Sequence, residues 1–161
     1  MARFDNVPGE PGIPGPQGPV GPQGPALEPA ETSFTVLGGT DGNPPTFNGS
    51  PLFTGSYVKI GSLVTFRIDV DFDNITNFGT GQYFVQLPFN AKYGTMLRSG
   101  CLHRASNNNQ YAINGHVFAG SNVLTLWYTA GTGQDEAFDH NSPYTITVND
   151  NFHITGTYIA E

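Results

Sequence analysis

The stretch SLVTFRIDVDFD, residues 62 to 73, alternates apolar and polar side chains. A β-strand turns successive side chains to opposite faces, so this alternation predicts a strand with one face in a hydrophobic core. The core face would hold Val64, Phe66, Ile68, Val70 and Phe72, and the polar face would hold Thr65, Arg67, Asp69, Asp71 and Asp73.

Shorter segments with the same character follow this strand and precede it, and no stretch of ten or more residues after residue 31 has apolar residues at helical spacing. Turn-forming clusters separate the segments, at 38–45, 74–81, 106–109, 131–133 and 139–143. The pattern predicts an all-β domain, with a jelly-roll-like two-sheet sandwich as the leading candidate and a barrel as the alternative. The predicted strands are 32–37, 55–60, 62–73, 82–87, 97–103, 110–118, 122–129, 143–148 and 152–159.

The N-terminal part of the chain is a different material, because residues 8–25 contain 6 of the 21 Gly and 7 of the 13 Pro. Gly recurs every third residue through six uninterrupted triplets. In a triple helix of polyproline-type chains, only Gly fits the crowded axis at every third position. The period therefore predicts a collagen-like homotrimeric stalk rather than a flexible Pro-rich linker. The axis residues are Gly9, Gly12, Gly15, Gly18, Gly21 and Gly24.

Such a stalk would be a rod on the order of 50 Å long. Six triplets are too few to hold three chains together unaided, so the β head is expected to trimerise too. The predicted organisation is an attachment peptide at 1–7, the stalk at 8–25, a linker at 26–31 and the head at 32–161. In the peptide, Phe4 and Val7 are candidate anchors in a partner, with simple fraying of the end as the alternative.

Charge and cysteine content exclude several classes of function. The formal net charge is −7, and the 6 Lys and Arg are scattered, so binding to nucleic acid or to an anionic membrane is not expected. The apolar runs are far shorter than the roughly 20 residues that span a bilayer, which argues against membrane insertion. The single Cys101 excludes an internal disulfide and a multi-cysteine metal site.

No motif for catalysis or for a cofactor is found, and we expect neither an enzyme nor a cofactor. Asp69, Asp71 and Asp73 are weak candidates for holding a hard cation, with a solvated outer face as the simpler interpretation. The four histidines lack the close spacing of a zinc site, and Cys101 near His103 is interpreted as a core thiol beside a polar histidine. The acidic residues of segment 135–139 are interpreted as a solvated rim.

Aromatic and amide side chains in the predicted loops are compatible with recognition of a cell-surface glycan, because aromatic faces stack on sugar rings and amides bind hydroxyls. They are equally compatible with ordinary turns. These residues are Phe47, Phe53, Tyr93, Asn107 to Asn109, Phe138 and Asn141.

The pairing of a Gly-x-y stalk with a β head resembles the collagen-stalked trimers of the C1q and tumour-necrosis-factor-like group. Four strings have a closer resemblance, to the C-terminal domain of minor tail proteins of phages that infect actinobacteria. They are GSYVKIGSLVTFRIDVDF (55–72), FGTGQYFVQLPFNAKY (78–93), GHVFAGSNVLTLWYT (115–129) and DNFHITGTYIA (150–160). The resemblance implies a virion protein assembled in host cytoplasm and exposed on the particle, and it carries over no catalytic or binding residue.

The resulting hypothesis is a non-enzymatic homotrimeric phage virion protein, either a minor tail protein or a short tail fibre. Its N-terminus would attach to another virion protein, and its head would face outward and bind the host cell surface, with a glycan as the expected ligand. A capsid decoration protein is the alternative. A glycan depolymerase is a third hypothesis, which predicts a cleft with two carboxylates about 5 to 9.5 Å apart.

Overall fold

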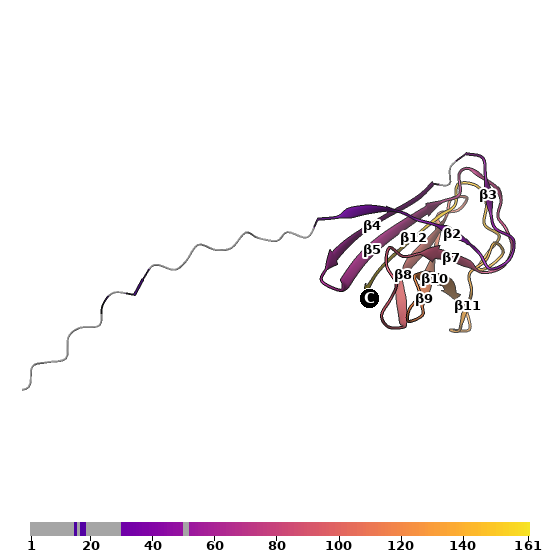
Figure 1. Cartoon of the computed structure of the whole chain (residues 1–161). Coiled ribbons are helices and arrows are strands. Elements are labelled where there is room, and N and C mark those ends of the chain that lie inside the picture. The colour runs from indigo at the N-terminus through magenta and orange to yellow at the C-terminus, as the bar shows by residue number, and fades with distance from the viewer. Residues whose placement is uncertain (1–14, 16, 19–29, 50–51) are drawn as a thin grey trace, which may run out of the picture.

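The computed structural model describes residues 15, 17, 18, 30–49 and 52–161. Within these residues the secondary structure consists of β-strands, with no helix, so the all-β prediction is confirmed there. The strands are β1 (Thr32–Thr35), β2 (Gly38–Thr40), β3 (Thr46–Phe47), β4 (Leu52–Ile60), β5 (Leu63–Asp71), β6 (Ile75–Asn77), β7 (Tyr83–Gln86), β8 (Thr95–Arg104), β9 (Asn109–Val117), β10 (Val123–Thr129), β11 (Asp135–Ala137) and β12 (Asn151–Ile159) (Figure 1).

Strand β5 follows the alternation that the sequence predicts. Val64, Phe66, Ile68 and Val70 are buried, as is Phe72 just beyond the strand end, while the residues between them face outward. Each buried side chain of this size contributes about 1.5–3 kcal/mol relative to an exposed one. One strand therefore supplies a large share of the apolar surface around which the head folds.

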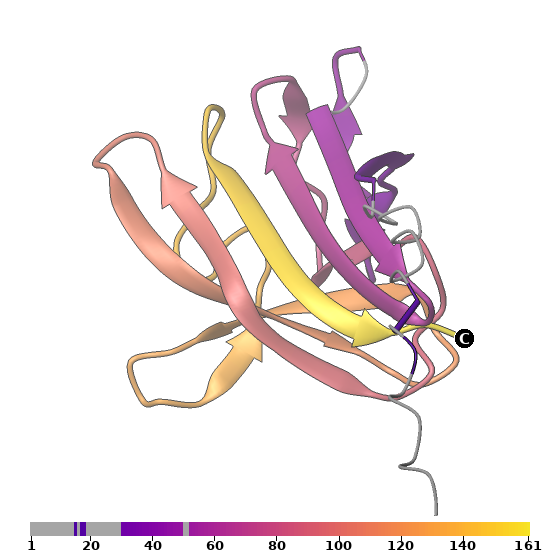
Figure 2. The ribbon, with the colours of Figure 1, turned by 90° about the vertical axis from the view of Figure 1, so that its left-hand side faces the viewer.

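The main sheet is antiparallel and has the strand order β1-β4-β5-β12-β8-β9-β10-β7-β2, with β11 added beside β10. β4 and β5 form a hairpin, and β8, β9 and β10 form a meander. β12 fills the space between these units, pairing with β5 along its whole length and with β8 along part of it (Figure 2). The C-terminal strand is therefore what joins the two units into one sheet.

The sheet is strongly curled, as its topology requires. β1 and β2 are separated by only two residues in the chain, yet they lie at the two opposite ends of the strand order. A flat sheet would place its ends too far apart for so short a connection. The closing strand lies tightly against the other end of the sheet, since a Cβ added to Gly38 would be 3.0 Å from the Phe53 ring of β4. A small second sheet, β3 with β6, lies outside this order.

The core lies inside the curl and is rich in aromatic rings. The centroid of the Phe72 ring lies 5.9 Å from that of Phe78 and 6.0 Å from those of Tyr83 and Phe152. Phe138 packs edge-on against Phe152 at 5.6 Å. Tyr83 belongs to β7 and Phe152 to β12, while the other three rings come from the residues directly after β5, β6 and β11, so loop residues complete the core at this end of the strands.

The strand predicted at 143–148 is wrong, although its apolar residue is placed correctly. Ile146 is buried and the residues on both sides of it are exposed, as in a half-buried strand. The backbone, however, joins no sheet: the Ile146 amide donates to the carbonyl of His140, only six residues earlier. Segment 139–150 is thus a loop that folds over the core.

The sequence also missed four very short strands. β2 lies inside the predicted turn cluster at 38–45 and β6 inside the cluster at 74–81, and β3 and β11 were not predicted. Each has only two or three residues, too few for an alternation to be visible. Their strand conformation is fixed by the partners they pair with, which are far away in the sequence.

Candidate functional site

Asp69, Asp71 and Asp73, the weak candidates for holding a cation, lie along β5 and just beyond its end, and neighbouring groups bond to the first two. Arg67 donates two hydrogen bonds to the Asp69 carboxylate, from Nε to Oδ2 at 2.7 Å and from Nη2 to Oδ1 at 2.9 Å. This contact raises the pKa of the guanidinium. Asp71 Oδ1 accepts the backbone N–H of Asp73, which lies beyond the strand end. The pKa of Asp73 is raised by desolvation and by Asp71. The described part of the chain holds no group of three or more His, Cys, Asp or Glu side chains that could bind a metal ion.

The four histidines have separate surroundings. His103 Nε2 lies 2.7 Å from Asn108 Oδ1. The ring centroids of His116 and Phe118 are 4.3 Å apart, and those of His140 and Phe78, which are stacked, are 4.6 Å apart. His153 of β12 lies opposite Cys101 of β8. The thiol predicted to be in the core is only half-buried.

A carboxylate network occupies the outer face of β9, β10 and β11, in the segment predicted to be a solvated rim. Asp135 accepts hydrogen bonds from Asn114 Nδ2 and Thr129 Oγ1, both at 2.9 Å, and Arg98 Nη2 lies 3.2 Å away. Glu136 instead accepts the Tyr128 hydroxyl at 2.6 Å, and this bond raises the pKa of that tyrosine. The sequence analysis missed Asn114, which is buried in the middle of β9.

A second carboxylate that the sequence analysis missed is Asp150, which has no exposed surface. Its side chain accepts the backbone N–H of Ala105 at 2.9 Å, and the N–H and hydroxyl of Thr147 at 2.8 and 3.1 Å. Its own carbonyl accepts the N–H of Phe72. Asp150 therefore ties loop 139–150 to the ends of β5 and β8. The pKa of Tyr144 in this loop is raised by burial and by Asp150.

The aromatic residues considered for glycan recognition do not form one surface. Phe138 lies in the core, and Phe47 packs edge-on against Phe53 at 5.4 Å. Tyr93 is exposed, while Asn107 Oδ1 accepts the backbone N–H of Asn109 and so stabilises its own turn. Most of these residues therefore serve packing and turns.

Two shallow hollows lie on the outer face of β1, β4, β5 and β12. One has a volume of about 290 Å³ and lies over Ser33, Ser56 and Asp69, and the other has about 220 Å³ and lies over Thr65 and Thr155. Glu31 and Arg67 line both. Small polar side chains line much of the first hollow, whereas Tyr57, Val58 and Phe66 give the second a largely apolar lining. Both hollows open beside the point where the chain enters β1.

The exposed large apolar side chains are the other surface feature, and most belong to one end of the strands. Backbone hydrogen bonds join the β4–β5 turn, segment 90–93 and the C-terminal residues there, such as Ala160 N–H to Ser62 and Lys92 N–H to Ile159. β8 begins and β9 ends at the same end, because Thr95 pairs with Val117. The exposed apolar residues at this end are Ile60, Leu63, Tyr93, Met96 and Phe118, and the other two exposed apolar residues are Leu37 and Val148.

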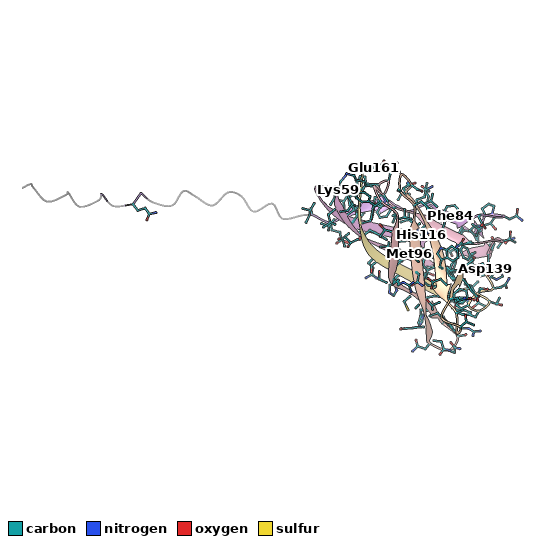
Figure 3. The ribbon with its side chains drawn as sticks, turned by 90° about the horizontal axis from the view of Figure 1, so that it is seen from below. Lys59, Phe84, Met96, His116, Asp139 and Glu161 are labelled. Atoms are coloured by element: carbon teal, nitrogen blue, oxygen red, sulfur yellow. The ribbon has the colours of Figure 1, made fainter. Side chains whose placement is uncertain are left out.

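Figure 3 shows where this end of the strands lies in the head. Lys59 and Glu161 lie at the end of the head where β1 begins, and Phe84 and Asp139 lie far from it (Figure 3). We name this the stalk-side end. Most of the predicted stalk, and the candidate anchors Phe4 and Val7, lie outside the described residues, so those predictions stay open.

No family model matches the chain, and no curated protein or solved structure was found to match it. In the part of the chain that the structure describes, no helix is long and apolar enough to cross a membrane.

Proposed function

We propose that this chain is a non-enzymatic homotrimeric virion protein of a phage, a minor tail protein or short tail fibre that holds a β head away from its attachment point. The observation that carries the proposal is the unbroken glycine period from Gly9 to Gly24, placed a few residues before the first strand of a β head. The curled sheet is taken to be a jelly-roll-like head, and the resemblance of its strings to phage minor tail proteins supports the virion setting.

The glycine period is the feature that points to contact between chains. Gly recurs at every third residue of the predicted stalk, and each of the six triplets also contains Pro. A triple helix accounts for this period, because two further chains occupy the space beside each glycine.

The proposed work of the molecule is adhesion. Residues 1–7 attach the stalk to another virion protein, and the three heads face outward toward the host cell. Three heads on one stalk convert a weak single-site interaction with a repetitive surface glycan into stable attachment through avidity. This arrangement needs no bound cofactor and no catalytic group.

The proposal is tested first by the mass of the purified full chain in analytical ultracentrifugation. A trimer at micromolar concentration is expected, and a monomer contradicts the proposal. Antibody labelling of intact phage particles then locates the protein. Label on the tail supports the tail-fibre assignment, whereas label spread over the capsid favours a decoration protein.

A further inference from the structure

The start of the head is held close to the stalk by the length of chain between them. The sixth triplet ends at Ala26, and β1 begins at Thr32. Six residues span at most about 20 Å when fully extended. In the trimer of the proposed function, on which this inference rests, three copies of Thr32 must therefore lie within about this distance of the end of one rod. The stalk-side ends of three heads are thereby crowded together.

One exposed apolar surface at this end is the hairpin patch, formed by Val58, Ile60, Leu63 and Ile159. Pairing across the sheet places Ile60 opposite Leu63, and Leu63 opposite Ile159, so the three share the outer face. Ile60 and Leu63 are 60% and 42% exposed. Beside them the Thr65 and Thr157 hydroxyls bond to each other at 3.0 Å. These short side chains leave room for another molecule to pack against the patch.

A different apolar surface at the same end is the Met96 patch, formed by Met96, His116 and Phe118. Met96 of β8 pairs with His116 of β9, and the His116 ring packs against Phe118 at 4.3 Å. Met96 and His116 lie next to each other in the view from below (Figure 3). Met96 and Phe118 are 49% and 60% exposed. The hairpin patch lies on β4, β5 and the end of β12, and the Met96 patch lies on the β8–β9 side of β12.

Threefold symmetry requires two such surfaces. Around a threefold axis each copy contacts its two neighbours through two different parts of its surface, so the interface is heterologous. We propose that the hairpin patch of one copy packs against the Met96 patch of the next copy, and that this contact, repeated three times, is what trimerises the head. The partner of this surface is therefore a second copy of the same chain.

The test uses the full chain with three matched substitutions, Leu63→Glu, Phe118→Glu and Val148→Glu. Val148 is 44% exposed, close to the value for Leu63, but belongs to neither patch. Sedimentation equilibrium measures the concentration at which half of the chains are trimeric, and circular dichroism confirms the β fold. This concentration is expected to rise on the order of 10- to 100-fold for L63E and for F118E, because each removes one apolar side chain from the contact. V148E is expected to behave like the unaltered chain.

A cross-linking experiment tests the pairing itself. With Cys101→Ser as background, Leu63→Cys and Phe118→Cys are combined and treated with a short bis-maleimide. A chain with both cysteines is expected to give covalent trimers, whereas a chain with one gives at most dimers.

Each outcome separates the inference from the proposed function. If the unaltered chain is monomeric, the proposed function itself fails. If it is trimeric and either L63E or F118E remains as trimeric as V148E, or if the chain with both cysteines gives no covalent trimer, then the patch-to-patch contact is wrong while the trimeric stalk-and-head protein stands.

Discussion

Replacing Asp150 by alanine removes a buried side chain that links loop 139–150 to the end of β8. The substitution deletes three hydrogen bonds to a carboxylate, two from backbone amides and one from a hydroxyl. A hydrogen bond to a charged group contributes about 1.5–3 kcal/mol, and an unpaired buried donor costs about 1–3 kcal/mol. Ala105 and Thr147 are themselves exposed, so water recovers part of this loss. We expect Asp150→Ala to lower the free energy of unfolding by about 2–3 kcal/mol.

We attribute the loss of stability to the carboxylate oxygens and not to the smaller volume of alanine. The Asp150→Asn variant distinguishes these two causes. Asp150→Asn keeps one acceptor oxygen in nearly the same shape, so about half of the loss is expected. Asp73→Ala removes a carboxylate that is exposed and should change stability by no more than about 0.5 kcal/mol.

The assay is thermal unfolding followed by circular dichroism at one fixed protein concentration. For a head of this size, 2–3 kcal/mol corresponds to a fall in Tm of about 6–12 °C. If D150A unfolds within 2 °C of D73A, then Asp150 does not hold the loop and the reasoning is refuted. A loss in D150N as large as in D150A would show that charge, rather than the number of accepting oxygens, is decisive.

Three further predictions concern the stalk, the sheet and the tyrosines. Gly18→Ala should weaken the collagen-type circular dichroism band and leave the head folded, whereas Gln17→Ala should leave the band unchanged; an unaltered band in G18A would contradict the triple helix. Gly156→Ala places a Cβ 2.7 Å from the nearest Leu97 carbon and should lower the free energy of unfolding, measured with denaturant, by about 1–3 kcal/mol. Gly131→Ala, whose Cβ meets no atom within 4 Å, should leave it almost unchanged. Burial raises the pKa of Tyr158 to about 12, above the ordinary 10.0 of the unfolded chain, so stability should fall as pH rises from 10 to 12, and a Tyr158→Phe variant that falls equally steeply would rule this out.

Strands with a clear alternation of apolar and polar residues could be predicted from the sequence. β5 alternates over nine residues, and its buried set agrees with the prediction residue by residue. The alternation reports only which side of a strand is buried, however, and not whether the backbone pairs with a neighbour. Segment 143–148 shows the difference, because Ile146 is buried as in a strand while its amide bonds within the loop.

Polar residues of the head were harder to predict than apolar ones. Asp150 belongs to a turn, where aspartate ordinarily faces water. Thr147 of the same turn supplies local donors, but the donor from Ala105 comes from the end of β8, 45 residues away in the sequence. Asn114 likewise gains its partners Thr129 and Asp135 by strand pairing over 15 and 21 residues of sequence. The exposed apolar patches depend on the same long-range pairing, which a local pattern does not contain.

The place of β12 in the sheet bears on how the molecule is made. The two units on either side of it, the β4–β5 hairpin and the β8–β10 meander, can each form from local contacts during synthesis. They have no shared sheet until Asn151–Ile159 has left the ribosome and entered between them. The sheet is thus completed only by the last strand to be translated. A chain cut before Asn151 would keep both units and lack the strand that pairs with each of them, so we expect it not to form the single curled sheet.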